Sequence, residues 1–528
     1  MVGGHYRQFA YRRSADQDAR SPAHHPVAII GAGPVGLTLA LDLARRAIPV
    51  VLLDDSDRIG EGSRAICFAK RTLEIFDRLG LAEAMVAKGV TWQTGKVFHG
   101  QDQLYAFDLL PEPGHKQPAF INLQQYYVEA ALADAAEAEP LVDLRWANRL
   151  SDIAPRNDGA TLTIETPDGP YRLDAAWVVA CDGARSPTRS RLGLDFHGEA
   201  FEDQFLIADV KMRAEFPTER WFWFAPPFHS GQSALLHKQP DDIWRIDLHL
   251  DRDADPEHER HPETVRPRLE HMLGHGDFAL EWVSVYRFHC RRLERFVHGR
   301  VVFAGDAAHQ VSPFGARGAN SGIQDADNLG WKLALVLQGR SPASLLDSYD
   351  SERIQAADEN ILNSTRATDF IAPRSPGERI LRDAALALAP RTGFAKRFVN
   401  SGRLSLPTAY EASPLSTPDR AWQGGIPPGA AFVDAPLSAA ARPWLSEALG
   451  EGGPVLLGHG LDAEALVPAG VTVIGITPGP DEALIRRYAL APGDAYLLRP
   501  DGHVAARFHH PTRAEVAAAI ERLEGREP

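Results

Sequence analysis

Short apolar runs alternate with stretches of helical periodicity over the first part of the chain. Val27–Ile30 and Val50–Leu53 are apolar throughout, which is typical of strands buried on both faces of a parallel sheet. Between them, Leu37–Arg46 repeats its apolar residues at helical spacing. The order of strand, helix and strand predicts a βαβ unit.

The same two patterns predict further elements. Helices are expected at Arg71–Leu79, Gln125–Ala138 and Asn328–Leu337, and buried strands at Ala176–Ala180 and Val301–Ala304.

From about Phe201 to Tyr286 the period changes to two, and aromatic residues become frequent. Ile243–Leu248 is an example of this alternation between apolar and polar positions. Such a period indicates strands with one buried face, so we expect an antiparallel sheet inserted between the buried strands Ala176–Ala180 and Val301–Ala304.

Proline and glycine mark linkers around 373–376 and 407–428. The remainder reads as a small αβ module. Its expected elements are strands at Val455–Leu457, Val471–Ile476 and Ala495–Leu498, a hairpin turn at Asp501-Gly502 and a helix from Ala514.

Composition limits the class of protein. The chain has 528 residues, so two or three domains are expected. The formal net charge of -14 argues against nucleic acid as a partner. No apolar run approaches the roughly 20 residues that span a bilayer, so no membrane partner is expected.

The three cysteines, Cys67, Cys181 and Cys290, are far apart and form no CxxC. Neither a zinc site nor a disulfide framework is therefore expected. This cysteine usage and the polar N-terminus without a hydrophobic signal core predict a reducing cytoplasmic location.

A glycine-rich turn follows the first strand. Glycines at these spacings let the backbone approach a diphosphate, and the next helix offers its N–H groups and positive dipole end. The carboxylate of Asp54, or alternatively Asp55, stands after the second strand, where it can accept hydroxyls of an adenosine ribose. The residues of the turn are Gly31, Gly33, Pro34, Val35 and Gly36.

Two more motifs each follow a buried strand. The first carries Asp182, Gly183 and Arg189. In the second, Gly305 precedes Asp306, which can hydrogen-bond a ribityl hydroxyl. A loop poor in side chains opens the helix that follows, and its N–H groups can face the N1–C2=O edge of a flavin, where negative charge collects on reduction. The loop residues are Pro313, Gly315, Gly318, Ala319 and Asn320.

In this order the three motifs indicate an FAD gripped at its diphosphate, near its middle and along its ribityl chain. The chain resembles the class A flavoprotein aromatic hydroxylases, which have the para-hydroxybenzoate hydroxylase fold. Within them it is most similar to the longer members typified by 3-(3-hydroxyphenyl)propionate hydroxylase, phenol hydroxylase and polyketide hydroxylases. The specific motifs cover Val27 to roughly Thr368.

The resemblance implies an α/β fold with three domains. It implies a Rossmann-like FAD-binding domain of the glutathione reductase type, an inserted antiparallel-sheet substrate domain and a small thioredoxin-like C-terminal domain. We expect residues 27–200 and 287–400 to form the first, 201–286 with part of 99–120 the second, and 405–528 the third. Residues 1–26 are expected to form an N-terminal arm.

The resemblance also implies roles for individual residues. The family motif DGxxSxxR matches Asp182, Gly183, Ser186 and Arg189 and serves both FAD and NAD(P)H in relatives. Arg64 matches an arginine in the loop after the second strand, and Gln124 or Gln125 a glutamine that touches the ribityl chain. The spacing to Glu129 favours Gln125. The expected catalytic residues are Pro313, Arg64, His237 and Tyr286.

The activity implied is hydroxylation of a phenolic or other aromatic substrate. The expected reactants are FAD, NADPH or NADH, and molecular oxygen, with a flavin C4a-hydroperoxide as the oxygen donor. No metal is expected. The protein is expected to form a homodimer. His229, Gln232 and Arg245 join His237 and Tyr286 as sheet residues that could meet the substrate.

Two alternatives stay open. Trp221–Pro226 is similar to the WxWxIP box of flavin-dependent halogenases, with Ala225 in place of Ile, but an aromatic-rich strand of the substrate sheet is the favoured explanation. The chain could also bind flavin without catalysis. Gly458–Ala463 mimics a dinucleotide turn, but too few residues follow for a second nucleotide domain. His309 is expected to be structural.

Overall fold

A largely parallel sheet forms the centre of the molecule. The structure is a computed structural model that describes residues 7–60, 65–229, 232–399, 405–419, 422–438 and 442–526. The sheet has the order β17-β18-β11-β1-β2-β8, with β10 and β9 added antiparallel beside β11. Its strands are β1 (Ala23–Ile30), β2 (Val50–Leu53), β8 (Val142–Arg145), β9 (Arg149–Arg156), β10 (Gly159–Glu165), β11 (Tyr171–Ala180), β17 (Val297–His298) and β18 (Val301–Phe303).

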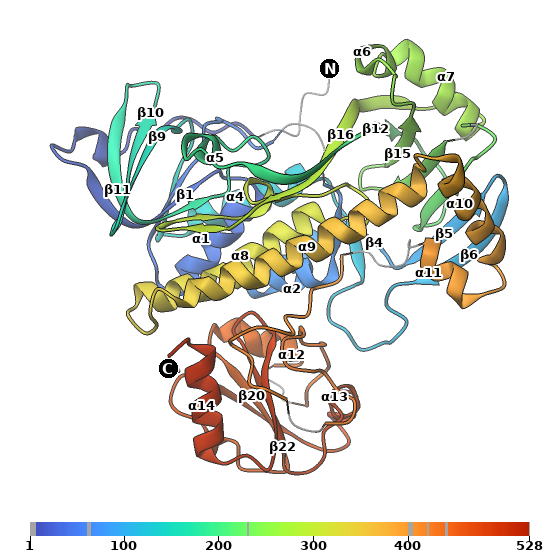
Figure 1. Ribbon diagram of the computed structural model, residues 1–528. Helices are drawn as coiled ribbons and strands as arrows, with labels where there is room; N and C mark the ends of the chain where they lie inside the picture. The colour runs from blue at the N-terminus through green and yellow to red at the C-terminus, as the bar shows by residue number, and fades with distance from the viewer. Residues whose placement is uncertain are drawn as a thin grey trace.

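Helices cover this sheet. α1 follows β1 directly and packs between the sheet, α4 and α8, because its side chains are apolar on nearly every side. Figure 1 shows α8 and α9 running side by side across the middle of the molecule. The helices are α1 (Pro34–Arg45), α2 (Lys70–Arg78), α3 (Ala82–Lys88), α4 (Gln125–Ala138), α5 (Pro187–Arg191), α8 (Gly318–Leu337) and α9 (Leu345–Ile371).

A second, antiparallel-rich sheet has the order β19-β16-β12-β15-β14-β13-β5-β6. One face packs on α7 (Pro262–Leu273) through Trp244, Ile246, Val265 and Leu269. A small β3-β7-β4 sheet lies beside it. The strands are β3 (Cys67–Ala69), β4 (Val90–Trp92), β5 (Thr94–His99), β6 (Asp102–Asp108), β7 (Phe120–Asn122), β12 (Phe196–Lys211), β13 (Arg220–Phe224), β14 (Ser233–Lys238), β15 (Ile243–Leu250), β16 (Ala279–Leu293) and β19 (His309–Gln310).

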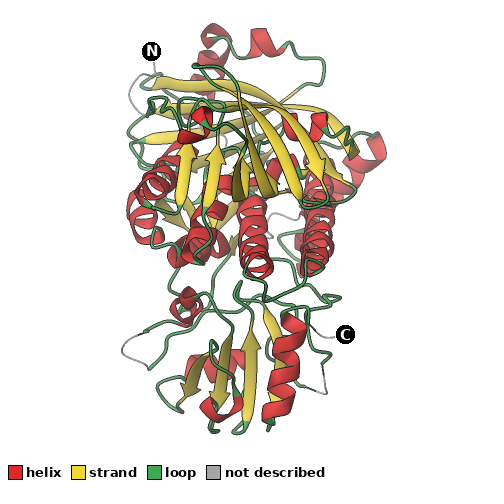
Figure 2. Cartoon of the chain, turned by 90° about the vertical axis from the view of Figure 1, so that its left-hand side faces the viewer, coloured by secondary structure: helices red, strands yellow, loops and turns green. Residues whose placement is uncertain are grey.

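The chain then forms α10 (Pro376–Leu388) and α11 (Gly393–Val399) and enters the C-terminal module, a name used here for residues 405–528. Its sheet has the order β21-β20-β22-β23, and it lies below the helices of the central domain (Figure 2). Its elements are α12 (Leu445–Ala448), β20 (Val455–His459), β21 (Thr472–Ile476), α13 (Glu482–Tyr488), β22 (Asp494–Leu498), β23 (Val504–His509) and α14 (Arg513–Leu523).

These layers confirm the predicted α/β fold class with its inserted sheet and small C-terminal unit. Two helices begin earlier than the periodicity predicted: α1 at Pro34 rather than Leu37, and α8 at Gly318 rather than Asn328. α9 was not predicted. Within the described ranges, no helix is long and apolar enough to cross a bilayer.

The described part of the N-terminal segment packs on the body. Phe9 stacks on Trp146 with ring centroids 4.2 Å apart, and Tyr11 donates a hydrogen bond to Thr166. Asp16 lies between His25 and Arg145, at 2.8 and 2.7 Å.

Candidate functional site

The glycine turn closes tightly between β1 and α1. A Cβ at Gly36 would lie 2.0 Å from the carbonyl oxygen of Gly31, so only glycine fits there. Gly31 also has φ +102°, which favours glycine. By contrast, a Cβ at Gly33 would meet nothing within 4 Å. The backbone at Gly33 is therefore open, as approach by a diphosphate requires.

Asp54 holds this turn in place. Its carboxylate accepts the N–H of Ala32 at 2.6 Å and the N–H of Ser56 at 2.8 Å. Burial raises the pKa of Asp54 to about 6, although these two hydrogen bonds oppose the shift. Each carboxylate oxygen can accept a further bond, so a ribose can still be held here. Asp55 is exposed.

Gln125 and Gln124 face different neighbours. Gln125 accepts the N–H of Ala65 at 3.0 Å and donates to Glu129 at 2.7 Å, and Glu129 accepts the N–H of Gly60 at 2.7 Å. Gln125 thus contacts Ala65, which follows Arg64 in the sequence; Arg64 itself lies outside the described residues. Gln124 is buried and donates to the carbonyl of Pro240, in the turn between β14 and β15 of the second sheet, at 3.4 Å.

The second motif is tied to the third by Arg189. Its guanidinium donates to the carbonyl oxygens of Ala184 at 2.9 Å and Ala307 at 3.1 Å. Asp182 accepts the N–H of Thr188 at 2.9 Å, and burial raises its pKa. Gly183 has φ +74° and open space where a Cβ would stand. Arg189 and Asp182 therefore organise the backbone of the motif.

The third motif rests on a buried carboxylate that sequence reasoning missed. Asp325 accepts the N–H of Gly305 at 2.8 Å and lies 2.6 Å from His309 Nε2 and 2.5 Å from Arg353 Nε. Burial raises its pKa, but His309 and Arg353 outweigh burial and keep that pKa below its usual value. His309 is 1% exposed and belongs to this buried cluster.

Asp306 itself is exposed beside this buried cluster. Val35 from the glycine turn packs against the same place, since a Cβ at Gly305 would lie 2.9 Å from its Cγ2 atom. The first and third motifs are thus in contact.

The loop into α8 is fixed by the side chain of Asn320. This amide accepts the Ala69 N–H and the Thr72 hydroxyl, at 2.8 and 2.6 Å. It donates to the carbonyls of Cys67 and Ala316, at 2.8 and 2.6 Å. All four of its hydrogen-bonding positions are filled, so only its backbone is available to a cofactor. Pro313 is exposed, and Gly315, Gly318 and Ala319 are half-buried.

A row of charged and polar side chains crosses the inner face of the second sheet. His237 pairs with Arg245, and Arg245 pairs with Asp209, so the three stand side by side on neighbouring strands. Arg245 makes two hydrogen bonds of 2.8 Å to Asp209. Arg220 extends the row beyond His237, because the next residue, Trp221, pairs with Leu236.

Several atoms of this row have no hydrogen-bond partner among the described residues. They are Arg220 Nη1, His237 Nδ1, Gln239 Oε1 and Asp247 Oδ1. Burial raises the pKa of Asp247 to about 6 and, together with Arg220 and Arg245, holds the pKa of His237 well below its usual value. Buried polar atoms normally find partners, so these are suited to a ligand.

An aromatic cluster connects the Pro313 loop with the second sheet. Phe314 packs edge-on against Phe205 and Phe288, with centroids 4.8 and 6.1 Å away. Tyr286 pairs with Phe205 across the strands and is 40% exposed. His229 bonds the carbonyl of His249 at 2.6 Å. Gln232 bonds Asp251.

The halogenase-like segment is part of an ordinary strand. Trp221 and Trp223 lie on β13, on the face opposite the polar row, and contact Phe98 at centroid distances of 5.5 and 5.3 Å. Gly458 and His459 lie inside strand β20, so this segment forms no dinucleotide turn.

These residues fit FAD. The open backbone at Gly33 suits the diphosphate, the unfilled positions of Asp54 suit the ribose, and exposed Asp306 suits the ribityl chain. The N–H groups that begin α8 suit a flavin edge that becomes negative.

Known proteins share both sequence and fold with this chain. Residues 24–364 match the family described as FAD binding domain. The 6-methylpretetramide 4-monooxygenase of Streptomyces rimosus is 33% identical over 94% of this chain and 93% of its own length. The 3-(3-hydroxy-phenyl)propionate/3-hydroxycinnamic acid hydroxylase of Mycolicibacterium smegmatis is 31% identical over 74% of this chain and 70% of its own length.

Two solved structures are similar over nearly the whole chain. The flavin-dependent monooxygenase PieE, in complex with FAD and substrate, superposes with a TM-score of 0.81 at 23% identity, covering 96% of this chain and 100% of its own. The anhydrotetracycline hydroxylase OxyS of Streptomyces rimosus superposes with a TM-score of 0.74 at 26% identity, covering 95% and 99%. The glycine turn, the two later motifs and these matches agree, and the chain belongs to the FAD-binding domain family, among its flavin-dependent monooxygenases.

Proposed function

We propose that this protein hydroxylates an aromatic substrate that carries an ionisable oxygen, using FAD, NAD(P)H and molecular oxygen. The names of the relatives support this activity, since one is a 6-methylpretetramide monooxygenase and another a hydroxylase of a hydroxyphenyl propionate. The observation that carries the proposal is the row of unpartnered polar atoms on the inner face of the second sheet.

Arg220 is the residue we expect to bind the substrate oxyanion. A buried guanidinium with an unpartnered nitrogen gains most from a carboxylate or phenolate, because such hydrogen bonds are charge-assisted. Arg245 is already paired with Asp209, whereas Arg220 has a nitrogen atom that can still donate a hydrogen bond to a ligand. Asp247 and His237 offer nearby atoms that can accept a substrate hydroxyl proton or bond.

The surrounding residues orient the ring and exclude water. Reduced FAD and O2 supply the transferred oxygen, and NAD(P)H supplies the electrons. Phe205, Phe288 and Phe314 form an apolar wall that keeps water from the reacting centre. The polar row holds the ionisable group, so the ring is presented in one orientation.

A substrate screen tests the activity. NAD(P)H consumption and hydroxylated product should rise together for anionic phenols, whereas a protein that only binds flavin would give neither. A chlorinated product dependent on chloride would favour the halogenase instead.

Variants of Arg220 then test the binding role. Arg220→Gln should raise KM about 10- to 100-fold, the loss expected of one hydrogen bond to a charged group, while FAD affinity stays unchanged. The exposed Arg213→Gln is the matched control. An unchanged KM in Arg220→Gln would contradict this assignment.

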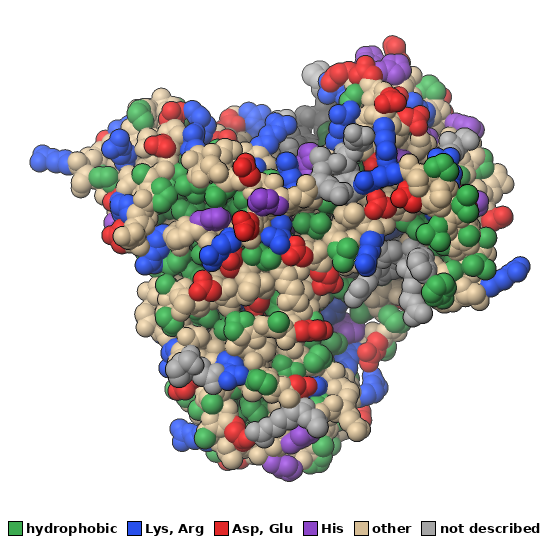
Figure 3. All heavy atoms as spheres, viewed as in Figure 1, with side chains coloured by type: hydrophobic (Ala, Val, Ile, Leu, Met, Phe, Trp, Pro, Cys, Tyr) green, Lys and Arg blue, Asp and Glu red, His purple; other side chains and the backbone are tan. Residues whose placement is uncertain are grey.

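We also propose a cytoplasmic homodimer. Exposed apolar side chains gather on α10, where Ile380, Leu381 and Leu388 are 71, 62 and 51% exposed. Figure 3 shows hydrophobic side chains at the surface on the side where α10 and α11 lie. Light scattering of the purified protein would give the mass of the assembly.

A further inference from the structure

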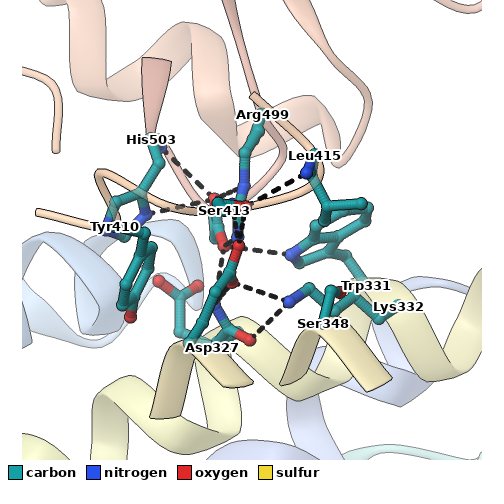
Figure 4. Close-up of polar contacts among 12 residues, drawn as sticks. Asp327, Trp331, Lys332, Ser348, Tyr410, Ser413, Leu415, Arg499 and His503 are labelled. Carbon is teal, nitrogen blue, oxygen red and sulfur yellow. Dashed lines mark hydrogen bonds and ion pairs between the residues drawn. The ribbon is translucent and has the colours of Figure 1, made fainter. Parts of the chain in front are cut away.

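The C-terminal module docks on the central helices through buried ions. Arg499, from the β22–β23 hairpin, bonds both oxygens of Glu352 on α9, at 2.6 and 2.9 Å. Lys332 on α8 lies 2.7 Å from the same carboxylate. These three side chains are at most 1% exposed. Figure 4 shows Arg499 reaching from the module toward Lys332 on α8.

A second carboxylate balances the charges. Asp501 lies 2.6 Å from Arg499 and accepts a hydrogen bond from the indole of Trp331 at 3.1 Å. Burial raises the pKa of Glu352, but Arg499 and Lys332 outweigh burial and keep that pKa far below its usual value. Removing one member of such a buried set would leave an uncompensated charge, so the four side chains depend on one another.

Tyr410 extends this cluster toward the third motif. It belongs to the first segment of the module, and its ring stacks on His503 with centroids 4.6 Å apart. Its hydroxyl accepts a hydrogen bond of 2.7 Å from Arg353 on α9. Tyr410 and Arg353 are each 1% exposed.

Arg353 in turn holds two pieces of backbone in the cofactor site. Its Nε atom bonds Asp325, which accepts the N–H of Gly305. Its Nη2 atom donates to the carbonyl oxygen of Ser321 at 3.1 Å and to the Ser321 hydroxyl at 3.0 Å. Ser321 lies in the first turn of α8. One guanidinium therefore connects Gly305 and the start of α8 with Tyr410.

We propose that the C-terminal module is a positioning element of the FAD site, acting through Tyr410, Arg353 and Asp325. Docking of the module fixes the guanidinium of Arg353, and Arg353 fixes the two backbone segments that face the cofactor. Coupling between two sites is reciprocal, so bound FAD must strengthen docking of the module.

The first test compares two buried tyrosines in the full chain. Tyr410→Phe removes the bond to Arg353. Tyr496→Phe is the matched control, because its hydroxyl donates to the carbonyl of Tyr488 at 2.9 Å inside the module. Both should lower the thermal midpoint, but only Tyr410→Phe should raise the Kd for FAD, by about 3- to 10-fold. Equal effects of both variants on Kd, or none in Tyr410→Phe, would overturn the proposal.

The second test needs no variant. Hydrogen exchange of peptides covering 494–509 should slow when FAD is added to wild-type protein. Exchange at the exposed hairpin turn Arg156–Asp158 should stay unchanged as an internal control. An exchange rate in 494–509 that is the same with and without FAD would refute the coupling. Because the proposal rests on the assignment of FAD to the Gly305 segment, Asp306→Ala is measured beside them. An unchanged Kd in that variant would instead reject the assignment.

Discussion

Asp306 and Asp325 divide the work of the third motif between an exposed and a buried carboxylate. Asp325 shapes the backbone at Gly305, whereas Asp306 is exposed at the end of the strand, where a ribityl hydroxyl can reach it. We predict that Asp306→Ala raises the Kd for FAD about 10- to 100-fold, since one charge-assisted hydrogen bond is worth roughly 1.5–3 kcal/mol. Fluorescence titration measures this, with the exposed Asp102→Ala as control.

The thermal midpoint of cofactor-free Asp306→Ala should stay close to that of the wild type, because the lost side chain is exposed. A large fall in that midpoint would show that Asp306 supports the fold instead.

Asp54 gives the cofactor site a pH dependence. Burial raises its pKa to about 6 in the cofactor-free protein, and ribose hydroxyls that donate to it favour the ionised form. Proton binding therefore competes with FAD, and we predict that the Kd rises as pH falls from 7 to 5, by at most about tenfold per pH unit. Titrations across this range check it.

Protonation of Asp54 has opposite effects on FAD affinity and on folding stability, so the two effects can be measured separately. A folded pKa above the unfolded value of 3.8 means that this carboxyl adds stability as pH falls from 6 toward 4. Protonation of Asp54 near pH 5 therefore stabilises the fold, so loss of stability at this residue does not account for weaker FAD binding. The Asp54→Asn variant should bind FAD less tightly at pH 7 and lose the pH dependence; an unaltered profile would point to another group.

At the scale of elements, two glycines of one turn should fail in different ways. We predict that Gly36→Ala lowers the thermal midpoint by several degrees or prevents folding, because its Cβ would overlap the carbonyl of Gly31. Gly33→Ala should keep the midpoint, since its Cβ meets nothing and its φ of -76° suits alanine. It should nevertheless lose FAD affinity, because the methyl group stands where the diphosphate approaches. Calorimetry and FAD titration measure the two effects, and normal FAD affinity in Gly33→Ala would place the diphosphate elsewhere.

Elements with a single dominant pattern were predictable. The pattern combines apolar runs at Val27–Ile30 and Val50–Leu53 with the glycine spacing of Gly31–Gly36. The structure places the two runs in strands β1 and β2, and Gly31–Gly36 as a turn that leads into the first residues of α1. The start of α8 was missed because Gly318, Ser321 and Gly322 are poor helix formers. Tertiary bonds from Asn320 and Asp325 hold that turn as a helix.

The long helix α9 escaped prediction for a related reason. Its buried face carries the charged residues Glu352 and Arg353 where apolar residues would be expected. Their charges are neutralised by ions on other elements. Apolar periodicity is therefore weak, although the helix is deeply packed. The same feature hid Arg353 and Asp325 as supports of the cofactor site.

For the whole molecule, sequence patterns placed a C-terminal unit but not its attachment. Arg499 and Glu352 are 147 positions apart, and nothing in either local pattern indicates the partner. Burial of paired charges between units is decided by the three-dimensional arrangement alone.

The last prediction concerns how NAD(P)H reaches the flavin. Gly458 and His459 lie within β20, so the described residues provide one βαβ glycine turn, to which we assign FAD. NAD(P)H must then meet a flavin ring that becomes accessible from the protein surface, and substrate in the inner site favours that position by occupying the alternative one. We predict that an anionic phenol accepted as substrate speeds anaerobic flavin reduction at least tenfold. Stopped-flow absorbance measures the rate, with the Arg220→Gln variant showing the same acceleration only at higher phenol concentration. A reduction rate indifferent to a phenol that the enzyme hydroxylates efficiently would instead indicate that a separate reductase supplies the electrons.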